Sequence, residues 1–138
     1  MSTLKKHEKD GEILSPVLKD GVVNYMIDID GTITDDVPNE DPQRMKVVKP
    51  YDGAVEICNK WYDEGNIITF FTSRTEDLRA ITENWLIKNG FKFHHILMNK
   101  PRGGNYHWID NHKVKATRFK GKFTEFVTKH KPIQVFED

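Results

Sequence analysis

An apolar stretch that ends in two closely spaced aspartates constrains this chain most. Residues 22–29 are apolar at nearly every position, which predicts a central strand covered on both faces. Side chains alternate along a strand, so Asp28 and Asp30 point to the same side at its end. Gly31 then lets the backbone turn sharply. Two carboxylates at the end of a buried strand are costly unless a cation or an uneven sharing of protons compensates them. The sequence therefore predicts a functional site here.

The apolar pattern that follows alternates between helical and strand periods. Helical spacing from Tyr51 to Glu64 ends at Gly65, and a second helix is expected from Thr75 to Gly90. The predicted strands are residues 22–29, 67–71, 95–98 and 106–109, with a short strand at 116–119 and a last helix at 123–129. This order is typical of a Rossmann-like α/β fold, an open parallel sheet with helices on both faces. Residues 33–50 are expected to be a loop with room for a short hairpin. Residues 1–21 are expected to be a tail or an irregular arm on the surface, and residues 22–138 one domain.

In such sheets, ligands bind outside the carboxyl ends of the strands. The polar residues that follow the predicted strands are Asp28, Asp30, Thr72, Ser73, Arg74, Lys100, Asp110 and Asn111. Taken singly, each has a plain structural explanation as a cap, a turn residue or a solvated loop residue. Together they supply carboxylates, a hydroxyl and an ammonium group, a set that suits a divalent hard cation and a phosphoryl group.

This order of residues resembles the haloacid-dehalogenase (HAD) superfamily of aspartate-nucleophile phosphatases. The resemblance runs from about Val23 to Val127, and its most specific part is Asp28-Ile29-Asp30-Gly31-Thr32. Asn111 stands where many members carry a second acid, which leaves the metal affinity open. Larger members insert a cap domain in one of two places, here residues 33–50 and 101–109. Both are too short for a domain, so the resemblance implies a small capless member with an open site.

The resemblance also implies roles for individual residues. Asp28 would be the nucleophile that forms an aspartyl phosphate, and Asp30 the acid and base. Mg²⁺ would be held by Asp28, the main-chain carbonyl of Asp30 and Asp110. Thr72 and Lys100 would bind the phosphoryl group. Candidates for binding the rest of the substrate are Ser73, Arg74 and Arg102.

Composition excludes several classes of function and favours a cytoplasmic protein. Lys and Arg number 21, as do Asp and Glu, so the formal net charge of zero gives no general attraction to nucleic acid or anionic membranes. The single cysteine, Cys58, excludes an internal disulfide framework, suits a reducing compartment and is expected in the core. No stretch is long enough to span a bilayer, so no membrane association is expected.

The favoured hypothesis is a phosphatase that acts on a small sugar or polyol phosphate of carbohydrate or surface-polysaccharide metabolism. The second hypothesis is a polynucleotide phosphatase, which an open site and a basic C-terminal third favour. The acidic stretch 28–41 and the absence of a clear ribbon of aromatic and basic residues argue against it, so nucleic acid is an unlikely partner. The third is a non-enzymatic phosphate- or metal-binding module. A homo-oligomer is expected because a capless site leaves the intermediate open to water.

Overall fold

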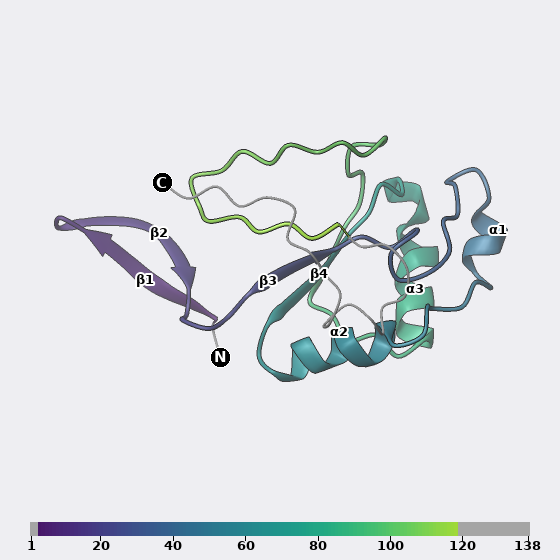
Figure 1. The fold of residues 1–138 in the computed structure, drawn as a ribbon, viewed down its shortest axis with the longest axis horizontal. Coiled ribbons are helices and arrows are strands. Elements are labelled where there is room, and N and C mark those ends of the chain that lie inside the picture. The colour runs from purple at the N-terminus through teal and green to yellow at the C-terminus, as the bar shows by residue number, and fades with distance from the viewer. Residues whose placement is uncertain (1–2, 119–138) are drawn as a thin grey trace.

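The computed structural model describes residues 3–118. They form an antiparallel hairpin and a three-stranded parallel sheet with its helices (Figure 1). The strands are β1 (Leu4–Lys9), β2 (Glu12–Leu18), β3 (Asn24–Ile27), β4 (Ile67–Phe71) and β5 (His95–Leu97). The helices are α1 (Pro42–Met45), α2 (Ala54–Asp63) and α3 (Arg79–Lys88), the last preceded by the 3₁₀ turn η1 (Glu76–Leu78). The predicted fold class is confirmed at this level: a mixed α/β domain with a parallel sheet.

The N-terminal segment is not irregular, contrary to the sequence-based expectation. β1 and β2 pair antiparallel with Leu4 opposite Leu18 and Lys9 opposite Glu12. The turn between them is Asp10-Gly11, and both residues have positive φ, at 54° and 79°. Asp-Gly is a favoured pair for such a turn, and it is the local signal for the hairpin. The hairpin projects from the side of the body opposite α1 (Figure 1).

The parallel sheet has the order β3-β4-β5, with Ile27 beside Phe70 and Phe70 beside Ile96. β4 covers the predicted range, whereas regular pairing of β3 starts at Asn24 and ends at Ile27. Asp28 therefore lies immediately beyond the carboxyl end of β3, at the edge where parallel sheets bind ligands. The sheet thus places the paired aspartates where the sequence predicts a site.

One face of this sheet carries the core. Tyr25 stacks on Trp61 of α2 with ring centroids 4.2 Å apart. Phe70 packs edge-on against Phe91, which in turn stacks on Trp85 of α3. Tyr25 and Phe70 lie on the same face, because Tyr25 pairs with Ile68, two residues before Phe70. Both helices therefore cover this face.

The opposite face of the sheet is more open among the described residues. Met26 of β3 and Leu97 of β5 are 41% and 45% exposed. The expected arrangement of helices on both faces is therefore not found within residues 3–118. The connection from β3 to β4 and the connection from β4 to β5 run in the same direction across the sheet. Right-handed crossovers in the same direction place their helices, α2 and α3, on the same face.

The two predicted helices between the strands are confirmed, whereas the strand predicted at 106–109 is not found. α2 and α3 lie within the predicted helices, and Gly65 and Gly90 follow their ends with positive φ. Residues 106–109 form no strand, and their backbone lies on the surface with Ile109 86% exposed. The expected strand at 116–119 is reduced, in its described part, to a single bridge residue, Thr117. The predicted helix 123–129 lies outside the described residues.

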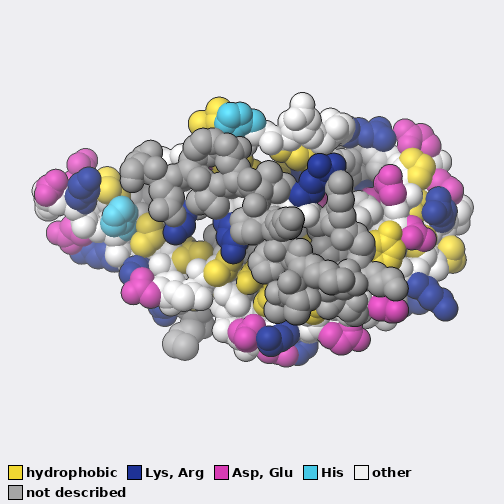
Figure 2. Space-filling model, viewed as in Figure 1, with side chains coloured by type: hydrophobic (Ala, Val, Ile, Leu, Met, Phe, Trp, Pro, Cys, Tyr) yellow, Lys and Arg dark blue, Asp and Glu magenta, His cyan; other side chains and the backbone are white. Residues whose placement is uncertain are grey.

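The described surface is polar and of mixed charge. Acidic and basic side chains are interspersed over the coloured part of the face in Figure 2, in keeping with the balanced composition.

Residues 33–50 contain α1 and a bridge from Thr34 to Pro50 instead of a hairpin. Within residues 3–118, no helix is long and apolar enough to cross a bilayer.

Candidate active site

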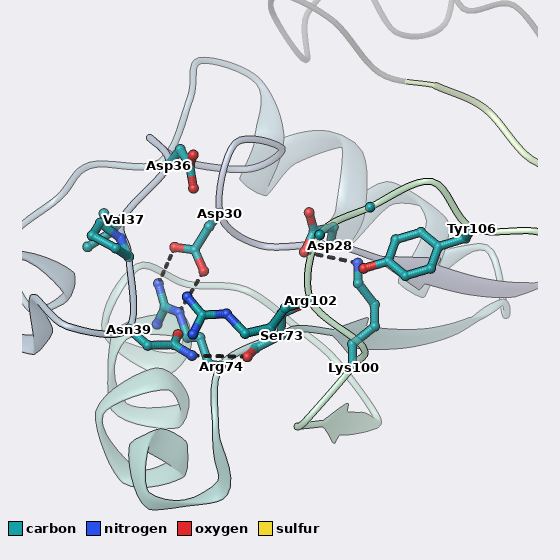
Figure 3. Close-up of a pocket in the computed structure, with 13 residues that line it drawn as sticks. Asp28, Asp30, Asp36, Val37, Asn39, Ser73, Arg74, Lys100, Arg102 and Tyr106 are labelled. Atoms are coloured by element: carbon teal, nitrogen blue, oxygen red, sulfur yellow. Dashed lines mark hydrogen bonds and ion pairs between the residues drawn. The ribbon is translucent and has the colours of Figure 1, made fainter.

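A cavity of about 340 Å³ opens at the carboxyl ends of β3 and β4 (Figure 3). It is bounded by the turn after β3, by part of the loop before α1 and by the loops after β4 and β5. The residues that line it are Asp28, Asp30, Asp36, Val37, Pro38, Asn39, Ser73, Arg74, Lys100, Arg102, Gly103, Gly104 and Tyr106. The structure therefore brings together six of the predicted site residues: Asp28, Asp30, Ser73, Arg74, Lys100 and Arg102.

The turn after Asp30 gives the two aspartates their positions. Gly31 has a φ of 79°, which is strained for residues with a side chain, and its N–H donates to the carbonyl of Thr34 at 2.9 Å. The N–H groups of Thr32 and Ile33 both donate to the carbonyl of Ile29. This tight turn holds Asp28 and Asp30 at the same end of the sheet, as the sequence predicts.

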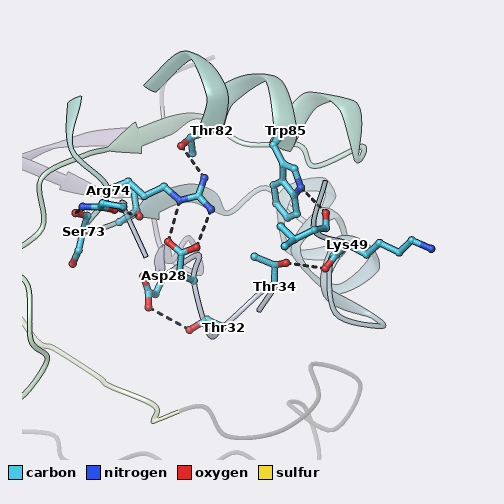
Figure 4. A network of polar contacts seen from close by, with 12 residues as sticks. Asp28, Thr32, Thr34, Lys49, Ser73, Arg74, Thr82 and Trp85 are labelled. Carbon is cyan, nitrogen blue, oxygen red and sulfur yellow. Dashed lines mark hydrogen bonds and ion pairs between the residues drawn. The ribbon is translucent and has the colours of Figure 1, made fainter. Parts of the chain in front are cut away.

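Asp28 is half-buried and faces a cation. The Nζ of Lys100 lies 3.4 Å from Asp28 Oδ1, and the hydroxyl of Thr32 donates to Oδ2 at 3.5 Å (Figures 3 and 4). Burial raises the pKa of Asp28, and the charge of Lys100 opposes this rise only in part. A further positive charge near Asp28 would therefore favour its ionised form.

Asp30 is held by a different cation. Arg74 Nε donates to Asp30 Oδ2 at 3.0 Å, and Nη2 donates to Oδ1 at 2.8 Å (Figure 3). The third guanidinium nitrogen, Nη1, donates to the hydroxyl of Thr82 on α3 at 2.9 Å (Figure 4). The side chain of Arg74 is fully buried. Its predicted role in substrate binding is not supported, because its donors are directed at Asp30 and Thr82.

The two hydroxyl residues after β4 have different surroundings. Thr72 is fully buried and does not line the cavity, and its hydroxyl oxygen accepts the N–H of Arg74 at 3.2 Å. The hydroxyl oxygen of Thr72 thus accepts from the main chain, and the contact of this hydroxyl with a phosphoryl group stays a prediction. Ser73 does line the cavity, and its hydroxyl donates to the carbonyl of Pro101 at 3.3 Å. Ser73 is the hydroxyl that a ligand in the cavity can reach.

Lys100 is held by main-chain pairing and by two aromatic rings. Its N–H donates to the carbonyl of Thr72 at 2.9 Å, which ties the loop after β5 to the end of β4. Its ammonium group lies 5.5 Å from the ring centre of Phe71 and 5.1 Å from that of Tyr106. Such contacts stabilise a cation and orient it toward Asp28.

Asp110 lies outside this cluster, contrary to the ligand set that the resemblance implies. Its carboxylate accepts the indole N–H of Trp108 at 3.1 Å and the N–H of His112 at 2.9 Å. The side chain is exposed, and these hydrogen bonds lower the pKa of Asp110. Within residues 3–118 the segment that carries it pairs with no strand, and the role of Asp110 as a metal ligand stays a prediction.

The sequence matches the family described as "PITM 1-3, LNS2 domain" over residues 25–131. This match covers most of the chain. The protein belongs to the LNS2 domain family. The fold of this family is of the HAD-like phosphatase type, which agrees with the paired aspartates and the parallel sheet. The hairpin of β1 and β2 lies before the matched residues.

Two solved structures are similar to this LNS2 domain. A crystal structure of a structural-genomics target from Vibrio cholerae is 21% identical, with a TM-score of 0.50, and the match covers 77% of this chain and 88% of that one. A chain of a Pnkp1/Rnl/Hen1 complex is 16% identical, with a TM-score of 0.49, and the match covers 75% of this chain and 40% of that one. The first likeness supports the fold. No curated protein matches this chain.

The donors at the cavity fit a hydrated divalent cation in part. The half-buried Asp28 carboxylate and the main-chain carbonyl of Asp30 are hard oxygen donors of the kind that Mg²⁺ prefers. The carboxylate of Asp30 is committed to Arg74. Within residues 3–118, no three His, Cys, Asp or Glu side chains are close enough together to hold a metal ion. A bound cation would therefore keep several waters or draw on Asp110.

Sequence reasoning missed part of the cavity wall. Tyr106, expected in the strand 106–109, instead lines the cavity beside Lys100. Val37 and Pro38 add apolar surface to the wall. These residues come from loops, and no sequence period marks which loop residues face a cavity. One signal in the sequence could have placed Tyr106 at the cavity: the turn 101–104 joins it closely to Lys100, which was expected at the site.

Proposed function

We propose that this protein is a Mg²⁺-dependent phosphomonoester hydrolase that acts on a small sugar or polyol phosphate. One observation carries the proposal: Asp28 and Asp30 stand at one sheet edge, each beside its own cation, in a cavity of ligand size. An aspartate nucleophile and a second carboxylate two residues later are the parts that this hydrolysis needs.

In the first half of the proposed reaction, a carboxylate oxygen of Asp28 bonds to phosphorus, the bond to the leaving oxygen breaks, and Asp30 gives its proton to that oxygen. In the second half, a water oxygen bonds to phosphorus, the bond to Asp28 breaks, and the proton of the water passes to Asp30. Lys100, 3.4 Å from Asp28, offsets the negative charge that gathers when a phosphate approaches this carboxylate. Ser73 and Arg102 on the cavity wall are the proposed contacts to the rest of the substrate.

Mg²⁺ would supply the positive charge that Asp28 and a phosphate dianion need in order to approach each other. The proposed ligands are Asp28, the main-chain carbonyl of Asp30 and Asp110. Asp110 lies four residues beyond Tyr106, which lines the cavity, a span of at most about 14 Å of chain. The raised pKa of the half-buried Asp28 supports this proposal, because a cation would favour the ionised form that attacks phosphorus.

The size and charge of the cavity favour a small substrate. A volume of about 340 Å³ is near the lower end of the range for small-molecule sites. Its wall combines polar groups of Asn39, Ser73 and Arg102 with apolar surface, which suits hydroxyls on a carbon skeleton. Asp36 also lines it, within the acidic stretch 35–41, and would repel a polyanion. A single phosphate, offset by Lys100, tolerates this field better.

We also propose a homo-oligomer. The cavity is open beside Tyr106 and Trp108, which are 53% and 51% exposed. A second copy that covers this rim would shield the phosphorylated aspartate from bulk water. Light scattering coupled to size exclusion tests this directly, and a monomeric mass at working concentration contradicts it.

Release of inorganic phosphate from a panel of substrates tests the function. The panel contains sugar and polyol phosphates, nucleotides and a 3′-phosphorylated oligonucleotide, each at two salt concentrations. We expect the highest kcat/KM with a sugar or polyol phosphate, little change with salt, and loss of activity in excess chelator. Preference for the oligonucleotide by about tenfold or more, with a steep loss in salt, would instead identify a polynucleotide phosphatase. Absence of release from every substrate, with Mg²⁺ present, would favour a binding module.

A further inference from the structure

Arg74 combines complete burial with a hydrogen bond from each of its three guanidinium nitrogens. Its side chain is 0% exposed, and the carboxylate that it holds, Asp30, is 15% exposed. Two nitrogens grip the two oxygens of Asp30, and the third contacts Thr82. A buried guanidinium is costly unless it is paired, and here each of its nitrogens has a hydrogen-bond partner. Arg74 therefore cannot reach a ligand without giving up Asp30.

The main chain of Arg74 is fixed as firmly as its side chain. Its N–H donates to the hydroxyl of Thr72, and its carbonyl accepts the N–H of Asn99 at 2.8 Å. Asn99 directly precedes Lys100, whose ammonium group faces Asp28. The cations that face Asp28 and Asp30 thus belong to two segments that are hydrogen-bonded to each other. This arrangement presents the two carboxylates to the cavity in fixed relative positions.

We propose that Arg74 is a positioning residue that holds Asp30 for the attack of water on phosphorylated Asp28. This inference rests on the function proposed above. Arg74 touches neither the substrate nor the reacting atoms. It fixes both oxygens of Asp30, so that one of them is directed at the water whose proton it takes. Thr82 in turn fixes the guanidinium.

If Arg74 positions Asp30, its loss should affect the two halves of the reaction differently. p-Nitrophenyl phosphate releases a weakly basic phenolate, which needs no proton from Asp30, so Asp28 and Lys100 suffice for the first half. Hydrolysis of the aspartyl phosphate still needs Asp30 to take a proton from water. Loss of Arg74 should therefore slow the second half more than the first, and the phosphorylated enzyme should accumulate.

Stopped-flow measurement of p-nitrophenolate release tests this with the full chain and Mg²⁺. In Arg74→Met, which keeps an unbranched buried side chain, we expect a burst approaching one equivalent per enzyme. Steady-state kcat should then be lower by about 100-fold or more, without a rise in KM. Arg74→Lys should restore part of the rate, because lysine keeps the charge but not the paired donors. Asp28→Asn added to Arg74→Met should abolish the burst.

Thr82→Val provides a milder variant in case Arg74→Met does not fold. It removes the partner of Nη1 and leaves the pair with Asp30, so a burst with a steady-state rate reduced about three- to tenfold is expected. If folded variants lose burst and turnover equally, or only KM rises, Arg74 binds the substrate phosphate and the proposal is wrong. If the wild-type protein is active and neither variant shows a burst, the proposal is also wrong. A wild-type protein that releases neither phenolate nor phosphate from any substrate of the panel refutes the proposed function, and this inference with it.

Discussion

Two regions contribute to the same cavity, and they are built in opposite ways. The strand-end cluster, formed by Asp28, Asp30 and Arg74, lies just beyond the ends of paired strands and is held by short polar contacts. The rim segment, residues 101–112, pairs with no strand in the described part of the chain. Its side chains are exposed, and positive φ at Gly103, Gly104 and Asn105 marks a succession of turns.

The difference shows how this domain divides positioning from recognition. The carboxylates need fixed geometry, and the ends of parallel strands provide it because main-chain pairing determines where they point. The rim is held by few contacts, among them the pair of Arg102 with Glu40 at 3.5 Å and the bond from Tyr106 to the carbonyl of Pro101. We therefore expect changes in the cluster to reduce kcat strongly, and changes in the rim to alter metal or substrate binding moderately.

The largest effect is expected at the nucleophile in the cluster. Asp28→Asn should lower phosphate release by about three decades or more, because no other group replaces the attacking carboxylate. Asp36→Asn is the matched control, since Asp36 lines the same cavity away from the strand end, and it should change the rate by no more than about threefold. Phosphate release under saturating substrate measures both. Retention of more than a tenth of wild-type activity by Asp28→Asn would show that the roles are wrong.

The same variant should be more stable than the wild type at neutral pH. Burial raises the pKa of Asp28 in the folded state above its ordinary 3.8. At a pH between 3.8 and this raised pKa, the folded state therefore binds more protons than the unfolded state. The stability of the wild type therefore falls as pH rises through this window, and the cost persists above it. Asparagine removes the cost. Urea unfolding should show a gain for Asp28→Asn at pH 7 that shrinks toward pH 3.5, whereas an equal gain at both values would contradict the assignment.

The next effect tests whether the rim segment joins the cluster when metal binds. If Asp110 is the third ligand, Asp110→Ala should raise the Mg²⁺ concentration for half-maximal activity by about tenfold or more. Asn111→Ala, on the same segment, serves as the control and should change it much less. Titration of activity with Mg²⁺ gives both values. An unchanged Mg²⁺ requirement in Asp110→Ala would limit the site to the cluster and remove Asp110 from the ligand set.

A smaller effect is expected at the ion pair that links the rim to the loop before α1. Arg102 and Glu40 are both exposed, so their pair is worth about 1 kcal/mol at most. Arg102→Ala should raise KM by about two- to fivefold with kcat nearly unchanged, because Arg102 contacts substrate in the proposed function. Glu40→Gln releases Arg102 and should leave KM unchanged or lower it. A large fall in kcat in Arg102→Ala would move Arg102 into the catalytic cluster.

The smallest effect requires no activity measurement. Trp108 of the rim is 51% exposed, whereas Trp61 and Trp85 of the core are 9% and 2% exposed. Iodide should therefore quench one component of the tryptophan fluorescence, and Trp108→Phe should remove this component. Trp61→Phe should leave the quenchable component in place. Equal protection of all three tryptophans would show that the rim is covered in solution, by a second copy or by another part of the chain.

Sequence alone determined the elements whose signals are local. The apolar runs before Asp28 and Thr72, the helical spacing from Ala54 and the glycines after α2 and α3 each predict their element without reference to the rest of the chain. The paired aspartates predicted a site because any strand would place them together at its end. Cys58 was expected in the core, and there burial raises its pKa to about 12.

Tertiary structure alone decided which side chains meet across distance. No local pattern distinguishes an arginine that binds substrate from one that is paired with Asp30. The packing of α3 against the sheet placed Thr82 beside Arg74. The orientation of the Thr72 hydroxyl depended on the turn after β4, and the exposure of Tyr106 and Asp110 on the absence of a pairing strand at 106–109. Strand and helix periods arise from neighbours along the chain, whereas these contacts join residues far apart in sequence, such as Asp30 and Arg74. Their partners are selected by the energy of the whole packed arrangement.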